Sequence, residues 1–270
     1  LAELGEMLRS RKLTSVALTE VTLSRLAAQG KRYNAVVTLM RDSAMSAARE
    51  ADREIAAGRY RGPLHGIPYG AKDLVATKGV ATTWGAAPYR KQVFDYDATV
   101  VERLRQAGAI LVAKLAMVEL AGGMGYTHAD ASFTGPGRTP WNPDFWSGGS
   151  SSGPGAAVAA GLVPFAIGSE TSGSILTPSA FSGVTGLRPT YGLVSRRGVL
   201  PLANTLDHVG PMTRTVRDNA LLLQTIAGHD AADPGSADVP IPDYAAGLEA
   251  GIKGLRIGLV RHFYTEDFSA

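Results

Sequence analysis

Apolar residues recur along the chain with the spacings of two kinds of secondary structure. Between Ser15 and Gln29 they lie mostly two to four positions apart, which is typical of an amphipathic helix, and Gly30 is expected to end it. Asp42 and Asp97 precede further such stretches and are expected to cap two more helices. In all, the pattern predicts helices at 15–29, 42–58, 97–106, 156–160 and 216–227.

Short apolar runs between these helices predict strands. They occupy residues 34–40, 67–72, 110–113, 163–167 and 255–260. Strands that alternate with helices favour an α/β fold. Residues 122–155 show little periodicity and are rich in glycine and proline, so we expect a long loop there, which inside a compact domain is often functional. The Asp- and Pro-rich segment 230–243 is expected to be an excursion from the regular fold.

Composition narrows the class of protein. Of the 270 residues, 45% are hydrophobic and 19% are charged, which favours a folded domain with a sizeable core. The formal charge is only +3 and basic residues mix with acidic ones, so no nucleic-acid partner is expected. No apolar run approaches the roughly 18 residues of a membrane helix, and the first 30 residues do not resemble a signal peptide. We therefore expect a soluble cytoplasmic protein with no membrane contact.

Metal and thiol chemistry are not expected. The absence of cysteine excludes disulfides, thiolate metal ligands and a cysteine nucleophile. The five histidines show no paired spacing, so neither a metal site nor another cofactor is predicted. We interpret the adjacent pair Asp207 and His208 as a surface turn, because adjacent residues rarely face the same centre. The histidines are His65, His128, His208, His229 and His262.

The first segment with candidate chemistry is GGSSSG at 148–153. Glycine-rich backbone that runs into a helix can bind an anion, but no GK[ST] follows, so this is not a P-loop. The segment matches G-x-S-x-G with Ser151 in the nucleophile position, although residues 141–146 before it are poor strand formers. A flexible loop is the alternative.

The second segment is GSETSGSILTPS at 168–179, which follows a predicted strand. Its small residues permit unusual backbone angles and allow successive N–H groups to face a ligand. A tight strand-to-helix turn is the alternative. The third candidate is Lys72 in GAKDL, either a solvent-facing side chain or, if buried, a neutral base, because desolvation lowers the pKa of a lysine.

Taken together, these segments resemble the amidase signature family. GIPYGAKD, GGSSSG and GSETSGSILTPS occur in the family's order, and Ser150 and Ser174 are 24 residues apart. The resemblance continues through TGLRPTYGLVSRRGVLPLANTLDHVGPMTRTVRD. It implies an α/β fold with a mixed β-sheet flanked by helices on both faces. It also implies that residues 1–270 form a single catalytic domain that lacks a C-terminal part.

The resemblance also implies roles for individual residues. Lys72 matches the family's catalytic lysine, Ser150 its bridging serine after a cis peptide bond, and Ser174 its acyl-forming nucleophile. The N–H groups of Thr171, Ser172, Gly173 and Ser174 match the oxyanion hole. Met124 is expected to contact the substrate. Apolar residues near the loop favour an uncharged or aryl substrate; these are Leu120, Met124, Tyr126 and Phe133.

Three positions depart from the family pattern. Ser152 stands where the family often has glycine, Ser172 replaces a frequent glycine in the oxyanion hole, and Leu176 replaces an arginine common two residues after the nucleophile. Ser172 retains its backbone N–H, so the hole can survive this change. The loss of the arginine removes a cation near the loop, so no subfamily substrate is transferred.

The predicted function is hydrolysis of a carboxylic amide to an acid and ammonia or an amine, through an acyl-enzyme on Ser174. The expected partners are a small-molecule amide, the C-terminal remainder of the chain and a second copy in a homodimer. One alternative is an α/β-hydrolase-type esterase in which Ser151 acts with His208 or His262. Another is a non-catalytic amidase-like subunit.

Overall fold

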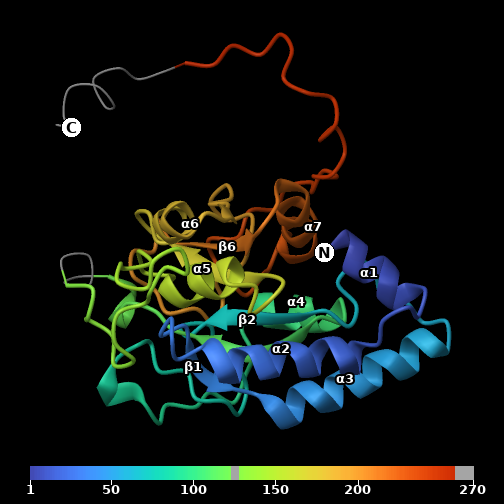
Figure 1. Ribbon diagram of the computed structural model, residues 1–270. Coiled ribbons are helices and arrows are strands. Elements are labelled where there is room, and N and C mark those ends of the chain that lie inside the picture. Colours follow the sequence, from blue (N-terminus) through green and yellow to red (C-terminus); the bar gives the residue numbers. More distant parts are fainter. Residues whose placement is uncertain (123–127, 259–270) are drawn as a thin grey trace.

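A six-stranded sheet runs through the protein in the order β1-β3-β2-β4-β6-β5 (Figure 1). The computed structural model describes residues 1–122 and 128–258. The strands are β1 (Val36–Leu39), β2 (Pro68–Lys72), β3 (Ile110–Leu115), β4 (Ala166–Glu170), β5 (Thr185–Gly186) and β6 (His208–Thr213). The helices are α1 (Ala2–Arg9), α2 (Ser15–Gln29), α3 (Arg41–Ala56), α4 (Thr99–Gln106), α5 (Ser152–Ala159), α6 (Leu176–Ser182) and α7 (Val216–Ile226).

The sheet is mixed, as predicted. The central strand β2 pairs in parallel with β3 and with β4, whereas β1, β5 and β6 join by antiparallel pairing. The C-terminal ends of β2 and β4, Lys72 and Glu170, therefore lie at the same edge of the sheet. In parallel sheets this edge commonly carries the ligand site.

Helices cover both faces, which confirms the predicted fold class. Tyr69 and Ala71 of β2 contribute to one buried cluster, together with α4 and α7. The other cluster is formed by α2, α3 and α5 against β3. Successive strand residues point to opposite faces, so Gly70 and Lys72 project away from the Tyr69 face. A side chain at Gly70 would place its Cβ 2.4 Å from a methyl group of Leu115, which explains the glycine.

Helix positions follow the periodicity well, but two predicted caps are wrong. The helix predicted at 15–29 is α2, and its first turn is capped by the Thr14 hydroxyl. Helix α3 begins after Met40 and α4 after Ala98, each without a side-chain cap. Asp42 lies within the first helical turn, where its charge faces the positive end of the helix. Asp97 instead accepts the backbone N–H of Lys78.

Several segments differ from the sequence prediction. The strand predicted at 163–167 is displaced to Ala166–Glu170, because residues 161–164 first complete the turn after α5. Asp207 and His208 are not a surface turn: both are buried, and β6 begins at His208, which pairs with Glu170. Helices α1 and α6 and strands β5 and β6 were not predicted from the periodicity.

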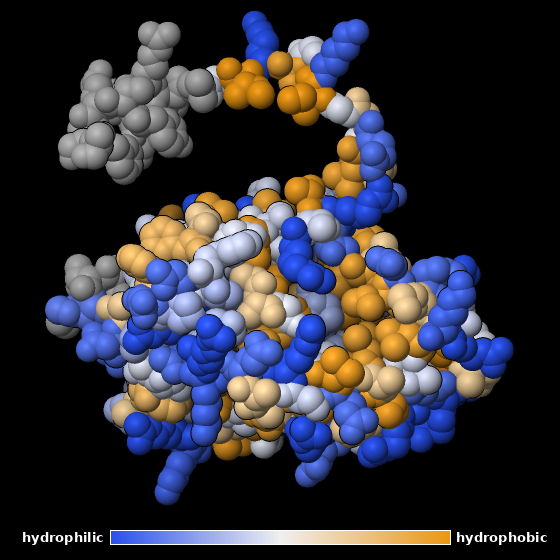
Figure 2. Space-filling model, in the orientation of Figure 1, coloured by the Kyte–Doolittle hydropathy of each residue, from blue (hydrophilic) through white to orange (hydrophobic). Residues whose placement is uncertain are grey.

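The strand predicted at 255–260 is not present over its described part. Residues 255–258 are exposed and have no strand partner among the described residues, and 259–260 lie outside those residues. Leu255 and Ile257 are 70% and 75% exposed. Figure 2 shows this segment, with orange apolar side chains, projecting from the body of the protein.

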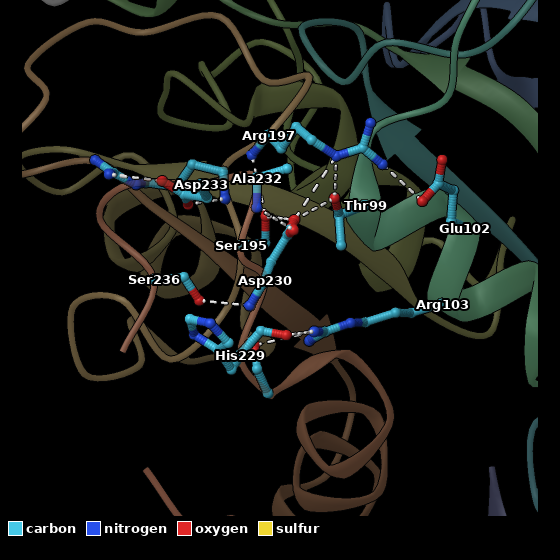
Figure 3. Close-up of polar contacts among 12 residues, drawn as sticks. Thr99, Glu102, Arg103, Ser195, Arg197, His229, Asp230, Ala232, Asp233 and Ser236 are labelled. Atoms are coloured by element: carbon cyan, nitrogen blue, oxygen red, sulfur yellow. Dashed lines mark hydrogen bonds and ion pairs between the residues drawn. The ribbon is translucent and has the colours of Figure 1, made fainter. Parts of the chain in front are cut away.

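The predicted excursion at 230–243 has no helix or strand, yet its first part is anchored firmly (Figure 3). The Asp230 carboxylate accepts hydrogen bonds from the hydroxyls of Thr99 and Ser195, both at 2.6 Å. Burial alone raises the pKa of Asp230, but these hydroxyls, the N–H of Ala232 and the charge of Arg197 together lower it to about 2. The segment is thereby joined to the N-terminus of α4.

No helix in the described part of the chain is long and apolar enough to cross a membrane.

A substitution at Phe165 tests the packing of this residue, which directly precedes β4, against Tyr69 of β2. Its ring is fully buried and stacks on Tyr69, with the centroids 5.1 Å apart. We expect Phe165→Ala to lower the free energy of unfolding by about 3–5 kcal/mol, because it leaves a cavity where the two rings meet. Urea unfolding measures this. The control Val21→Ala, at a position 55% exposed, is expected to change stability by less than about 0.5 kcal/mol; equal effects would contradict the described packing.

Candidate active site

The side chain of Lys72 ends in a buried cluster of hydroxyl groups. Its Nζ donates to Oγ of Ser150 at 2.6 Å and to Oγ of Ser169 at 2.9 Å, and lies 3.5 Å from the Ser169 carbonyl oxygen. Lys72 and Ser150 are completely buried. Strand β2 supplies the lysine, the turn before α5 supplies Ser150, and β4 supplies Ser169.

This environment favours a neutral amine. Burial lowers the pKa of Lys72 from 10.5 to about 7, while the negative charges of Glu170 and Asp207 act in the opposite direction. An amine with a pKa near 7 is partly neutral at physiological pH and can accept a proton. The burial hypothesis for Lys72 therefore holds, and the solvent-facing alternative is wrong.

The peptide bond between Gly149 and Ser150 is cis. The next residue, Ser151, donates its backbone N–H to the carbonyl oxygen of Ser174 at 3.1 Å. The structure thus brings all three residues predicted as catalytic into one region: Lys72 bonds Ser150 directly, and the main chain beside Ser150 bonds that of Ser174. A side chain at Gly149 would meet Val118 at 2.6 Å, so the close packing here requires glycine.

Ser174 lies on the short loop between β4 and α6 and is 2% exposed. The buried carboxylate of Glu170 holds this loop. It accepts the backbone N–H of Gly173 at 2.8 Å and of Leu176 at 3.0 Å, and also that of Ile175. Glu170 was not among the residues predicted from the sequence. Its signal is an acidic residue four positions before Ser174, within a segment otherwise composed of small and hydroxyl residues.

The residues predicted for the oxyanion hole lie on this loop, and some of their polar groups already have hydrogen-bond partners within the protein. Gly173 has a φ of +106°, which suits glycine, and its N–H is donated to Glu170. The Thr171 hydroxyl is donated to Asp207 at 2.5 Å. The participation of Thr171, Ser172 and Gly173 in an oxyanion hole stays a prediction, as does the substrate contact of Met124, which lies outside the described residues.

The leucine at position 176 does not leave the nearby Glu170 carboxylate without hydrogen-bond donors. Its side chain is 47% exposed, while its backbone N–H donates to Glu170. The three backbone N–H groups satisfy the Glu170 carboxylate, so the loop is held without the arginine common in the family at this position.

The geometry does not favour the esterase alternative. The Oγ of Ser151 is buried and is hydrogen-bonded to the backbone of Ser169, at 3.2 Å to its carbonyl oxygen and 3.3 Å to its N–H. The Nδ1 of His208 lies 2.6 Å from the carbonyl oxygen of Leu206 and also contacts Arg188. His262, the other candidate base, lies outside the described residues.

A cavity of about 480 Å³ opens beside the hydroxyl cluster. Its lining includes Ser169, whose hydroxyl accepts from Lys72, and Thr171, Asp207 and His208. The cationic side chain of Arg196 also lines it and is paired with Asp233 at 3.2 Å. The lining therefore combines apolar surface with charged groups that already have partners within the protein. No group of three or more potential metal ligands is found among residues 1–122 and 128–258.

A family model described as Amidase matches residues 17–270. The chain belongs to the amidase family. It is 46% identical over 264 residues to a glutamyl-tRNA(Gln) amidotransferase subunit of Geobacter metallireducens, covering 98% of this chain and 54% of that protein. It is 48% identical over 248 residues to the putative amidase AmiD of Mycobacterium tuberculosis, covering 92% of this chain and 51% of that protein.

Solved amidase structures share the fold. The peptide amidase of Stenotrophomonas maltophilia superposes with a TM-score of 0.83 at 40% identity, covering 91% of this chain and 52% of that one. A bacterial aryl acylamidase of the amidase signature family superposes with a TM-score of 0.85 at 31% identity, covering 94% and 52%. The chain thus spans about half the length of the relatives it matches.

The lowered pKa of Lys72 in this member of the amidase family predicts a pH-dependent stability. Below a pH of about 7 the amine is protonated in both the folded and the unfolded chain; between about 7 and 10.5 only the unfolded chain binds the proton, so the wild type gains stability as pH rises. Lys72→Met lacks this gain. We expect the stability of the wild type relative to Lys72→Met to increase from pH 7 to pH 9 in urea unfolding. A constant difference would contradict the lowered pKa, and Lys31→Met, at an exposed position, is the control.

Glu170→Gln tests the support of the loop. An amide has one acceptor oxygen in place of two, and its NH2 group faces N–H donors, so at least one of the three backbone groups loses its acceptor. We expect faster hydrogen exchange at Gly173, Ile175 and Leu176, and a loss of about 1–3 kcal/mol in stability. Exchange unchanged from the wild type would refute this support, and the exposed substitution Glu20→Gln is the matched control.

Proposed function

We propose that this chain carries the catalytic centre of a serine amidohydrolase, which cleaves a carboxylic amide to an acid and ammonia or an amine. The observation that carries the proposal is the 2.6 Å hydrogen bond between the buried amine of Lys72 and the Ser150 hydroxyl. A lysine with a pKa of about 7 in direct contact with a serine is suited to remove a proton near neutral pH.

In the proposed mechanism, neutral Lys72 accepts the Ser150 proton while Ser150 accepts the proton of Ser174. The Ser174 oxygen attacks the carbonyl carbon of the amide and forms a tetrahedral oxyanion. As the C–N bond breaks, the proton returns through Ser150 to the leaving nitrogen, and the acyl group remains on Ser174. Water, activated by the same relay, then releases the acid and restores the serine.

The oxyanion is proposed to form against backbone N–H groups of the loop at residues 171–174, other than that of Gly173, which is donated to Glu170. Each such donor contributes about 3–4 kcal/mol to lowering the barrier. The small residues of the loop allow the substrate to approach this backbone closely. Glu170 stabilises the loop by accepting hydrogen bonds from the N–H groups of Gly173, Ile175 and Leu176.

The cavity supports a substrate whose remote portion is uncharged. Its volume of about 480 Å³ lies in the range of small-molecule sites. Arg196, which lines the cavity, is already paired with Asp233. A charged group on the substrate would therefore find no unpaired arginine there to bind it. The relatives span about twice the length of this chain, and we propose that a C-terminal portion like theirs completes the pocket; a homodimer also stays a proposal.

Covalent labelling with a fluorophosphonate probe tests the nucleophile. We expect the wild-type chain to gain one probe mass at Ser174, and Ser174→Ala to gain none, because the attacking oxygen is absent. Intact-mass spectrometry with peptide mapping provides the measurement. The matched control is Ser151→Ala, which retains the backbone N–H bonded to Ser174 and is expected to label.

Labelling that persists in Ser174→Ala and disappears in Ser151→Ala would support the esterase alternative instead. A folded wild-type chain that takes up no probe would support the non-catalytic alternative.

A further inference from the structure

Asp207 joins two segments that meet beside the proposed active site. It lies directly before β6 and is 9% exposed. Its Oδ1 accepts the Thr171 hydroxyl at 2.5 Å. Its carboxylate also accepts the backbone N–H of Leu202 at 2.9 Å and that of Ala203 at 2.9 Å and 3.1 Å. One side chain therefore connects the loop that carries Ser174 with the segment that walls the cavity.

These contacts favour a carboxylate. Leu202 and Ala203 offer backbone N–H donors and Thr171 donates its hydroxyl, and an ionised carboxylate accepts at both oxygens. Hydrogen bonds to a charged acceptor are also stronger than those between neutral groups. An asparagine in its place keeps the shape: its single oxygen can accept the two backbone N–H groups, and its NH2 group can donate to the oxygen of Thr171. What it loses is the negative charge and the stronger hydrogen bonds that this charge gives.

Asp207 complements Glu170 on the same loop. Thr171 is the first residue after β4, and Asp207 holds it from the side of the cavity wall. Glu170 holds the following part of the loop through Gly173, Ile175 and Leu176. Two buried carboxylates therefore fix the backbone on both sides of Ser172, immediately before Ser174.

We propose that Asp207 is a positioning residue of the amidase reaction, which fixes Thr171, and with it the backbone leading to Ser174, against the cavity wall. The proposal rests on the amidohydrolase function proposed above. Asp207 forms no bond to the substrate in this scheme. It acts through Thr171, by limiting the positions that the oxyanion-binding backbone can adopt.

The charge of Asp207 also affects the pKa of Lys72, an effect that a purely structural role in the loop would not produce. The negative charges of Asp207 and of Glu170 on β4 favour the protonated form of Lys72, opposing the effect of burial on its pKa. Helices α5 and α6 contain no charged residue, and β6 begins with His208. Lys114 of β3 is paired with Asp73, which directly follows β2. Removal of the Asp207 charge therefore lowers the pKa of Lys72 further.

The test uses Asp207→Asn and measures the second-order rate of fluorophosphonate labelling at Ser174 from pH 5 to 9. The probe needs the nucleophile and its base but no knowledge of the natural substrate. We expect a plateau rate about 10- to 100-fold below the wild type, because neutral hydrogen bonds hold the reacting backbone less firmly than bonds to a charged carboxylate. We also expect the rising limb of the profile to move to lower pH, because neutral Lys72 is available earlier.

Two substitutions at Thr171 distinguish the effect of loop positioning from the effect of the Asp207 charge. Thr171→Val removes the hydroxyl but leaves the charge, so we expect a lower plateau rate, while the rising limb of the pH profile stays at its wild-type pH. Thr171→Ser keeps the hydroxyl, so we expect a plateau rate close to that of the wild type. The exposed substitution Glu20→Gln, on α2, is the control for loss of a distant charge and is expected to match the wild type throughout.

A wild-type plateau in Asp207→Asn would overturn the proposal, as would a reduced plateau whose limb has not moved. Circular dichroism checks that each variant is folded. If Asp207→Asn does not fold, the labelling rate of Thr171→Val tests the proposal instead. A wild-type plateau rate in Thr171→Val would overturn the positioning role of Asp207. A folded wild-type chain that does not label overturns the proposed function itself, and this role with it.

Discussion

The burial of one amine among hydroxyl groups is the constraint on which the rest of the site depends. Among the described residues, two lysines on neighbouring strands are fully buried: Lys72 on β2 and Lys114 on β3. Lys114 lies 3.4 Å from the carboxylate of Asp73, and burial lowers its pKa to about 8. Lys72 instead donates to the hydroxyls of Ser150 and Ser169, and its pKa falls to about 7. An amine bonded to a hydroxyl can lose its charge and take a proton from that group, whereas an amine paired with a carboxylate is held in its charged form.

The sheet explains how both lysines occur so close together. Lys114 is the register partner of Ala71, and side chains alternate along a strand, so Lys114 and Lys72 project from opposite faces. On one face, the Lys114 amine contacts Asp73 and donates hydrogen bonds to Val75 and Thr82, and so stabilises the segment that follows β2. The other face directs Lys72 toward α5. The same edge of the sheet therefore supports a structural ion pair and, on its opposite face, a candidate base.

In the loop that carries Ser174, the backbone and the carboxylates have complementary roles. The small residues of the loop make the backbone adaptable, and adaptable backbone loses more entropy on ordering. Glu170 and Asp207 supply that order by binding N–H and hydroxyl donors from within the buried site. Because both carboxylates also act on the pKa of Lys72, the shape of the loop and the pKa of this lysine are coupled.

By itself the sequence determined part of the local structure and the family. Periodicity located α2, α3, α4 and α7, and three motifs in order identified the family.

Other features were missed. Strand β4 is displaced by the local turn after α5, and Asp42 lies within the first turn of its helix, which periodicity does not resolve. The partner of Asp97 and the burial of Asp207 depend on contacts distant in the chain. Lys72 lies 78 residues from Ser150 and 97 from Ser169, and no spacing reports whether an amine is buried or which groups surround it. Only the tertiary structure decided that Lys72 has lost water, that Glu170 holds the loop, and that Asp207 reaches Thr171. Those properties arise from desolvation and short-range hydrogen bonds, which exist only once the strands have been brought together.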